Sequence, residues 1–277
     1  MTKHVALLAA VELAVGNNSL RVQENTTFGG TGLATLSIPA GTYYPRGDGA
    51  ADDLFFALRT MLQSHGNATL PNTYTVTTTW SSDPASPCAA LSVSAVGGSS
   101  FSLLWFDALS TLDSKLFGFP DTNTVFNTLA KASTLTPSSL WVSSDVYVEL
   151  EPEAEWDVSV RKARNGKVRG LRRGDRQQMR RLGLDFIDER RTLTSRITAD
   201  LSRAFETFLD DWNDGGHFEV HGLVPTSGTT LPTPTPLTRD GTAWHFNEDT
   251  ARKFTPRRQE PGLAVYAWEV GLLGYVA

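Results

Sequence analysis

The stretch Tyr74-Thr-Val76-Thr-Thr78-Thr-Trp80 decides the fold class, because its large apolar residues recur with a period of two. Tyr74, Val76 and Trp80 fall on one face of an extended strand. The threonines around them are β-branched, and such residues favour strands. This pattern is typical of a half-buried strand in an antiparallel sheet and predicts a β-rich fold.

Two further strands are predicted downstream, at residues 91–96 and 101–105. The connection Gly97-Gly98-Ser99-Ser100 is short enough for a β-hairpin. We therefore expect these two strands to pair with each other in antiparallel fashion.

One main helix is predicted in this half of the chain, over about residues 50–65. Asp52 and Asp53 favour its first turn, and Gly66 is a stop signal. Its apolar stripe comprises Leu54, Leu58, Met61, Leu62 and His65. A second, shorter helix is predicted from Leu109, Leu112 and Leu116, with Gly118 and Pro120 ending it. The main helix should lie across the face of a sheet.

The charge distribution divides the chain in two. Of its 277 residues, the first 144 hold 6 basic and 9 acidic residues, whereas the remainder holds 19 and 21. The small-residue stretch at 131–139 lacks an amphipathic period and predicts the boundary near residue 138. We expect an α+β, β-rich protein of two domains, 1–138 and 139–277, each with an antiparallel sheet or sandwich and one main packing helix.

The second predicted domain begins with segments of opposite charge. The acidic residues are Glu149, Glu151, Glu153 and Glu155, and the basic ones include Arg161, Arg164, Arg169, Arg172, Arg173 and Arg176. Charges of opposite sign can pair within the fold or bridge neighbouring copies, so these residues are candidates for a subunit interface. The net charge of −5 and the lack of a recognition module argue against a dedicated nucleic-acid binder.

The rest of this domain is predicted to contain strands at 184–187, 218–223 and 263–272. Its main helix is predicted at about 195–212, since Ser195 can cap it and its apolar residues recur at threes and fours. The Pro- and Thr-rich segment 225–238 is predicted to be an exposed extended arm. The conformation of residues 5–15 stays open, as strand or helix.

The sharpest chemical pattern is His217-Phe-Glu219-Val-His221. On a strand, its two imidazoles and its carboxylate would project from one face, as a two-histidine, one-carboxylate metal site requires. The alternative is an ordinary strand, with Phe218 and Val220 in the core and the polar residues facing water, and we favour it because short motifs are unspecific. The tripeptide Arg46-Gly47-Asp48 is interpreted as a turn.

Other classes of protein find little support. The lone Cys88 cannot form an intramolecular disulfide or supply a cysteine zinc cage. The longest apolar run, residues 5–15, is too short to span a bilayer and contains Glu12. No nucleophile elbow, phosphate loop or dinucleotide fingerprint is present. We therefore expect a soluble protein without enzymatic activity, cofactor or membrane partner.

Both halves carry a series of apolar and glycine anchor residues. In the first half these are Ile38-Pro-Ala-Gly41-Thr-Tyr43-Tyr44, the 52–62 helix, the 74–80 strand, Phe101-Ser-Leu-Leu-Trp105 and Leu116-Phe-Gly118-Phe119. In the second they are Gly166-Lys-Val-Arg-Gly170, Arg176, Leu184-Asp-Phe186, Ala204-Phe205, Phe208, Trp212, Gly215-Gly216 and Phe218. Together these residues resemble the anchors of tail-tip and baseplate proteins of tailed bacteriophages, in particular distal tail and related minor tail proteins.

The resemblance implies a structural component of the virion. Such a protein would form a ring with itself, contact other tail or baseplate proteins, connect the tail tube to the hub or fibres, and meet nucleic acid only as the passing genome. It would be made in the host cytoplasm and reside in the tail. The alternative is a saccharide-binding β-sandwich for host recognition, whose stacking residues would be Trp141, Trp156 and Trp244.

Overall fold

The structure, a computed structural model, describes residues 3–25, 31–65, 70, 73–81, 88–96, 100–124, 129–155, 158–162, 168–172, 177–191, 208, 212, 216–223, 230–231, 235–236, 243–246, 253–260 and 263–275. The first half comprises β1 (Lys3–Ala9), β2 (Val11–Leu13), β3 (Ser19–Asn25), β4 (Thr31–Ser37), β5 (Gly41–Tyr43), α1 (Leu54–Gln63), β6 (Thr73–Ser81), β7 (Ala89–Val96), β8 (Phe101–Leu104), the 3₁₀ turn η1 (Ser114–Phe117) and β9 (Ala130–Ala132). The second half comprises β10 (Leu140–Glu155), β11 (Val158–Lys162), β12 (Val168–Arg172), β13 (Gln177–Arg191), β14 (Phe218–Leu223), β15 (Thr230–Leu231), β16 (Thr235–Pro236), β17 (Ala243–Phe246), β18 (Lys253–Glu260) and β19 (Leu263–Tyr275). The described chain is therefore β-rich, and every sheet in it is antiparallel.

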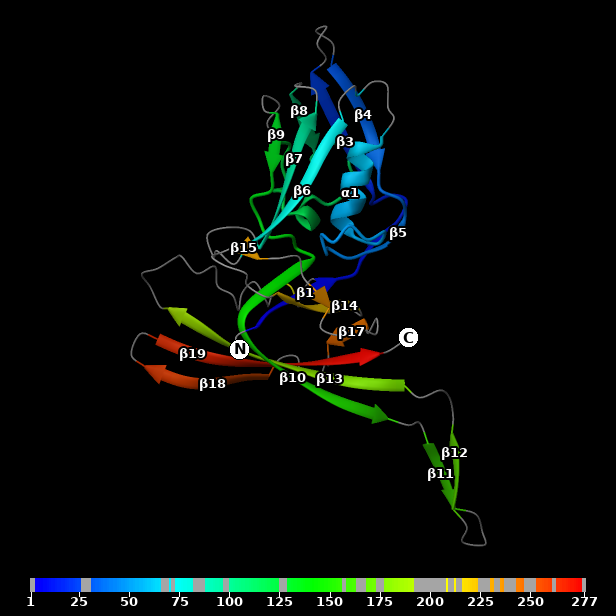
Figure 1. Ribbon diagram of the computed structural model, residues 1–277, viewed down its shortest axis with the longest axis vertical. Coiled ribbons are helices and arrows are strands. Elements are labelled where there is room, and N and C mark those ends of the chain that lie inside the picture. The colour runs from blue at the N-terminus through cyan, green and yellow to red at the C-terminus, as the bar shows by residue number, and fades with distance from the viewer. Residues whose placement is uncertain are drawn as a thin grey trace.

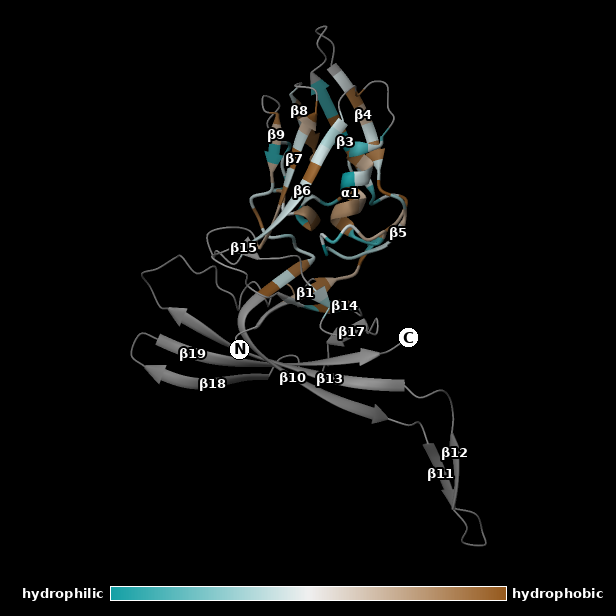
Figure 2. Cartoon of the chain, in the orientation of Figure 1, coloured by the Kyte–Doolittle hydropathy of each residue, from teal (hydrophilic) through white to brown (hydrophobic). Residues whose placement is uncertain are grey.

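Strands β2 to β9 and helix α1 form the body at the top of Figure 1. A sheet of order β4-β3-β8 and a second sheet of order β15-β6-β7-β9 enclose one apolar core. The alternation predicted for residues 74–80 is confirmed in β6, where Tyr74, Val76 and Trp80 are buried. Figure 2 shows the same alternation of polar and apolar residues along the strands of this body.

Helix α1 packs mainly against β6 and also contacts β4. Asp53 is its N-cap, and its side chain accepts a hydrogen bond from the Phe55 amide at 3.0 Å. The helix ends at Gln63, before the predicted stop at Gly66. Its buried residues are Leu54, Phe55, Ala57, Leu58, Met61 and Leu62. The helix predicted over about 50–65 is thus confirmed with shorter bounds.

Strand β1 lies between two apolar layers, so both of its faces are buried. Ala6 and Leu8 belong to the core of the upper body, whereas Leu7 points to the other side and is fully buried there as well. One edge of β1 pairs with β10 and the other with β14. Residues 5–15, left open by the sequence, are therefore mainly strand, as β1 and β2.

The pairing of β1 with β14 closes a sheet on itself. The strands run in the order β1-β10-β13-β19-β17-β14, and β14 returns to β1. Phe218 and Val220 of β14 are buried on one face, and the Phe218 ring meets that of Phe208 edge to face with 6.5 Å between centroids. Phe208, which falls within the helix predicted at about 195–212, is thus buried against β14.

Strands β10 and β13 are long, with 16 and 15 residues, and only residues 140–146 of β10 pair with β1 in the closed sheet. They continue past it, and the hairpin of β11 and β12 extends from their ends, away from the rest of the chain (Figure 1). Predicted strands at 184–187, 218–223 and 263–272 are confirmed as parts of β13, β14 and β19.

Two local predictions are wrong. β7 and β8 do not pair with each other, because β6 and β9 occupy the two edges of β7 while β8 pairs with β3 in the facing sheet. The helix expected from Leu109 onward is only η1, since Asp113 caps the turn at residue 114 and Leu109 lies in an exposed turn before it. Gly118 ends η1 with a φ of +73°, as a glycine after a helical turn commonly does.

The predicted boundary stretch, residues 131–139, is partly buried and partly exposed. Lys131, Ser133 and Ser139 are buried, and the Ser138 amide donates to the Lys115 carbonyl. The Trp212 indole nitrogen donates to the Ser138 carbonyl at 3.0 Å. The division at residue 138 stays a prediction, and β1 pairs with strands on the far side of it.

The Pro- and Thr-rich arm is held at two points. β15 pairs with the end of β6, and β16 pairs with β14, where Thr235 and Pro236 are exposed. Most of the predicted helix 195–212 lies outside the described residues, although Phe208 and Trp212 are helical. None of the helices in the described ranges has the length and apolar character needed to cross a bilayer.

Candidate functional site

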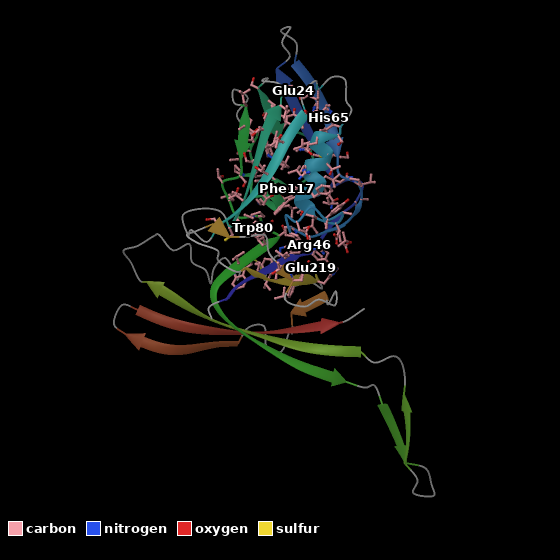
Figure 3. The ribbon with its side chains drawn as sticks, viewed as in Figure 1. Glu24, Arg46, His65, Trp80, Phe117 and Glu219 are labelled. Atoms are coloured by element: carbon pink, nitrogen blue, oxygen red, sulfur yellow. The ribbon has the colours of Figure 1, made fainter. Side chains whose placement is uncertain are left out.

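The site lies where β14 passes beneath the upper body. Glu219 and His221 alternate with Phe218 and Val220, so they occupy the face of β14 opposite the apolar layer. Glu219 pairs in register with Leu8 of β1, whose side chain belongs to the upper core. This register directs Glu219 and His221 toward the loop between β5 and α1, and Figure 3 shows Arg46 beside Glu219 at this junction.

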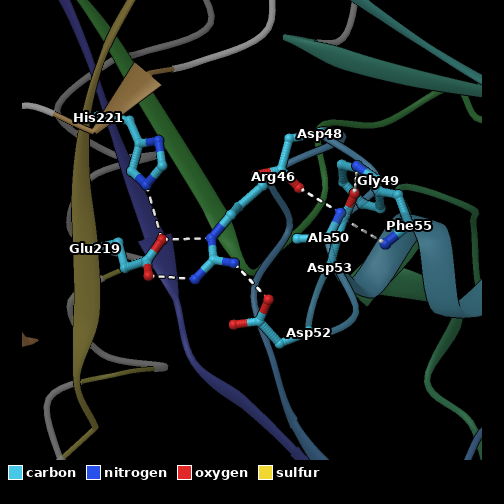
Figure 4. A network of polar contacts seen from close by, with 9 residues as sticks. All are labelled: Arg46, Asp48, Gly49, Ala50, Asp52, Asp53, Phe55, Glu219 and His221. Atoms are coloured by element: carbon cyan, nitrogen blue, oxygen red, sulfur yellow. Dashed lines mark hydrogen bonds and ion pairs between the residues drawn. The ribbon is translucent and has the colours of Figure 1, made fainter. Parts of the chain in front are cut away.

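Arg46 binds Glu219 in a two-point interaction. Its Nε donates to Glu219 Oε2 at 2.7 Å, and its Nη2 donates to Oε1. The third guanidinium nitrogen, Nη1, donates to Asp52 Oδ1 at 2.6 Å. Such fork-shaped pairing is the strongest geometry between arginine and a carboxylate. We call Arg46, Asp52, Glu219 and His221 the clamp (Figure 4).

His221 is the fourth member of the clamp and contacts the same Glu219 oxygen as Arg46 Nε does. His221 is 1% exposed, and its Nε2 lies 2.8 Å from Glu219 Oε2, to which it donates. Its Nδ1 is buried and has no hydrogen-bond partner in the described part of the chain. The Tyr44 ring covers the Arg46 guanidinium at 4.7 Å from its centroid and contacts the His217 ring edge to face at 6.0 Å.

The loop that presents Arg46 is built around Asp53. Besides capping α1, the Asp53 carboxylate accepts the Gly49 amide at 2.9 Å. Gly47 and Gly49 have φ angles of +69° and +81°, which side chains other than glycine rarely adopt. A Cβ at Gly47 would lie 3.2 Å from the Trp80 indole nitrogen. The tripeptide at 46–48 therefore lies in an irregular loop with a bend at Asp48, and the Arg46 side chain is mostly buried.

The clamp keeps its charged groups ionised. Burial alone would raise the pKa of Glu219, but hydrogen bonds from His221 and Arg46 outweigh it and lower that pKa to about 2. Burial would likewise lower the pKa of Arg46, yet its hydrogen bonds to Glu219 and Asp52 raise it. Burial, followed by the charge of Glu219, raises the pKa of Tyr44 to about 12. A carboxylate with so low a pKa is a poor proton acceptor, so the arrangement suits an ionic fastening between segments rather than acid–base chemistry.

The residues proposed for a metal site are only partly brought together. Glu219 and His221 are in contact, whereas His217 precedes β14 and packs against Tyr44. Both oxygens of Glu219 already accept hydrogen bonds from Arg46. Within the described ranges, no three His, Cys, Asp or Glu side chains form a group that could hold a metal ion. The favoured alternative was wrong in one respect, because the polar face of β14 meets the upper body instead of water.

The subunit-interface candidates lie far from the clamp along the long strands. Glu149, Glu151, Glu153 and Glu155 are on β10, Arg161 is on β11, and Arg169 and Arg172 are on β12. Arg164, Arg173 and Arg176 lie outside the described residues. The register sets Glu151 opposite Arg181 of β13, so part of the acidic segment has a basic neighbour in its own chain.

The saccharide alternative loses one of its three stacking residues. Trp141 is 3% exposed and offers no open ring face to a sugar. Trp244 is on β17, with its backbone paired to Phe218, and Trp156 lies outside the described residues.

Sequence reasoning missed Arg46 as a partner of β14 and Asp52 as a partner of Arg46. Arg46 and Glu219 are 173 residues apart, and nothing local in either segment indicates the other. The available signal in the sequence was the pair of glycines, Gly47 and Gly49, that closely follows Arg46. Both have positive φ angles in the structure, so they mark a loop whose conformation most other residues would not adopt. Comparison of the chain with protein-family models, curated proteins and solved structures finds no significant match in any of the three.

Proposed function

We propose that this chain is a non-enzymatic structural component of a bacteriophage tail tip or baseplate, a distal-tail-like ring or adaptor between the tail tube and the hub or fibres. The observation that carries the proposal is the β11–β12 hairpin, which projects from the ends of β10 and β13 (Figure 1). A hairpin that projects from a rigid sheet suits a subunit that reaches its neighbour in a ring. The two-domain α+β organisation is part of this proposal.

The positive charge of the β11–β12 hairpin supports a contact between copies. In the hairpin, Arg161 pairs in register with Arg169, and Arg172 pairs with Val158. Like charges directly opposite one another destabilise a strand pair unless an anionic group lies nearby. A carboxylate from a neighbouring copy would supply that group.

The acidic segment of β10 is the proposed counterpart. β1 pairs with β10 only as far as Val146, so among the described strands the segment from Glu149 to Glu155 pairs with β13 alone and has one open edge. Charged residues on an open edge discourage indiscriminate strand addition and leave the edge available to a partner of opposite charge. We propose that the basic hairpin of the next copy lies along this edge.

The clamp supports a structural role. Its guanidinium and its Glu219 carboxylate are occupied by each other, and they fasten β14 to the loop between β5 and α1. Exposed charge pairs between copies contribute only about 0–1 kcal/mol each, so such pairs would set the register of a ring while apolar contacts stabilise it.

The test is assembly of the purified chain in solution and its position in the particle. We expect rings whose size distribution shifts toward free subunits as salt rises, since salt screens exposed pairs. Reversing Arg161, Arg169 and Arg172 to Glu should weaken assembly without unfolding the subunit. The matched control reverses Lys253, Arg257 and Arg258 of β18, which changes the net charge equally at a different place.

Two results would contradict the proposal. One is a chain that sediments as a monomer at every concentration and salt. The other is electron microscopy of labelled particles that finds the chain outside the tail. Binding of the free monomer on a glycan array would instead favour the saccharide alternative.

A further inference from the structure

The outer edge of β4 borders a groove of about 560 Å³ that lies between this strand and α1. β4 is the last strand of the sheet β4-β3-β8, and among the described strands it pairs with β3 alone (Figure 1). The buried floor of the groove includes Leu36, Ala57 and Met61, and its exposed rim includes Thr60. The groove therefore gives access to a sheet edge.

The register of β4 shows which of its backbone groups point toward this edge. The Ile38 amide donates to the Asn18 carbonyl at 3.0 Å, directly after the paired residues of the two strands. Hydrogen-bonded pairs alternate along an antiparallel ladder, so Leu36 also bonds to β3 and its two neighbours do not. The N–H and C=O groups of Thr35 and Ser37 therefore point away from β3.

These outward groups have no partner in the described part of the chain. Thr35 and Ser37 are both exposed, both line the groove, and neither uses its backbone N–H or C=O in a hydrogen bond there. The groove thus presents two donors and two acceptors in alternation, at the spacing of a β-ladder.

β4 also lacks the features that protect the open edges of the long sheet. The open segment of β10 carries four glutamates and Pro152, and β18 carries Pro256 with a register shift beside it. β4 has no charged residue, no proline and no register shift. Charges, prolines and bulges discourage strand addition, so an edge without them is suited to receive a strand.

We propose that an extended, uncharged segment of a different polypeptide chain binds in this groove as an additional strand on β4. An extended backbone alternates acceptors and donors at the spacing that Thr35 and Ser37 present, which selects a polypeptide over other ligands. A side chain that shares the face of Leu36 would lie over Ala57 and Met61, so we expect it to be apolar. This site goes beyond the proposed function and does not depend on ring formation.

Two observations favour a segment of another protein over a second copy of this chain. Every strand in the described ranges already pairs with another strand of its own chain, so none of them is free to enter the groove. The helix α1 flanks the edge of β4 along the groove, and the space between them suits a single strand better than the edge of a second folded sheet.

Hydrogen exchange of the free protein tests the open edge first. The Thr35 and Ser37 amides should exchange about tenfold faster than the Leu36 amide, or more, because only the latter is bonded to β3. Slow exchange at all three amides would overturn the inference, since the edge would then already be covered.

Peptide binding tests the groove. The probe is a set of random heptapeptides selected by display on the full chain, then synthesised and titrated. Thr35→Pro removes only an outward N–H, whereas Thr35→Val keeps it. Affinity should fall about tenfold or more in Thr35→Pro and stay unchanged in Thr35→Val. Thr60→Arg, which fills the rim, should also weaken binding, and the control Thr75→Arg on the exposed face of β6 should not.

The same peptides should slow exchange of the Thr35 and Ser37 amides, and urea unfolding checks that each variant is folded. Peptides that bind Thr35→Pro and Thr60→Arg as tightly as the wild type would overturn the inference, as would a selection that yields none. Protection of these two amides that grows with protein concentration, without peptide, would identify a second copy as the occupant and would also overturn it.

Discussion

Replacing Glu219 with Gln removes the central charge of the clamp while keeping its shape. Each unit of pKa shift corresponds to about 1.4 kcal/mol, and the pKa of Glu219 falls from 4.5 to about 2 on folding. The ionised carboxylate therefore contributes about 3 kcal/mol to the free energy of unfolding at pH 7. Glu219→Gln should lose most of this amount. The side chain is 22% exposed, so solvent screening reduces the loss somewhat.

The pH dependence of this stability difference is a more specific test than its size at pH 7. Because the folded state lowers the pKa, the contribution is complete above about pH 4.5 and is lost as the pH falls toward 2. At pH 3 it should have declined to about 1 kcal/mol. Urea unfolding of the wild type and of Glu219→Gln at pH 7 and pH 3 should therefore show a gap that narrows in acid. Glu12→Gln, an exposed carboxylate on β2, is the control and should leave stability unchanged at both values.

A double-mutant cycle of Glu219→Gln and Arg46→Met tests whether the loss of stability comes from the Arg46–Glu219 pair. In an Arg46→Met background, Glu219→Gln should cost much less, because no guanidinium remains to be left unpaired. Equal losses in both backgrounds, or a gap that does not change between pH 7 and pH 3, would refute the reasoning that the pair with Arg46 is what Glu219 contributes.

Three further perturbations probe the packing. Phe218→Ala should cost about 3–5 kcal/mol in urea unfolding, since it empties a fully buried site beneath Phe208. Gly118→Ala should destabilise far more than Gly16→Ala, because a Cβ at 118 would lie 2.2 Å from the Leu135 carbonyl oxygen whereas one at 16 meets nothing within 4 Å; equal melting temperatures would contradict this. Tyr74→Phe should cost about 1.5–3 kcal/mol, because the Tyr74 hydroxyl donates to the fully buried Glu24 carboxylate; a stability equal to that of the wild type would show that Glu24 has sufficient donors without it.

Local patterns predicted which residues form elements and which face of each is buried. The alternation in β6 and the capped apolar stripe of α1 are properties of a few neighbouring residues, so a single sequence contains them. Strand partners are different, because a period of two says which face is buried but not which strand lies alongside. β7 and β8 were therefore paired through the short connection between them, although β8 pairs with a strand eighty residues earlier in the chain.

Local patterns also could not identify the partners of Glu219 and His221, because those partners are distant in the sequence. Glu219 and His221 could be identified as polar residues on one face of a strand, but that face was expected to meet water. Its burial depends on the loop around Arg46, which arrives from the other end of the sequence. The boundary predicted near residue 138 rests on the same kind of local pattern, and small hydroxyl residues can fill gaps next to a core, as Ser133 and Ser139 do, as well as form a linker.

The two-sided pairing of β1 also sets a schedule for synthesis on the ribosome. β1 is made before all the other strands of the closed sheet, yet its partners at 140–146 and 218–223 are made far later. At translation speeds of about 5–20 residues per second, β14 follows β1 by roughly ten to forty seconds. During that interval the nascent chain can complete β2 to β9 and then β10. β1 therefore lacks both partner strands until residues 140–146 are made, and lacks one of them until β14 is made. Translation stalled before β14 would therefore leave β1 with one unpaired edge beneath the upper body.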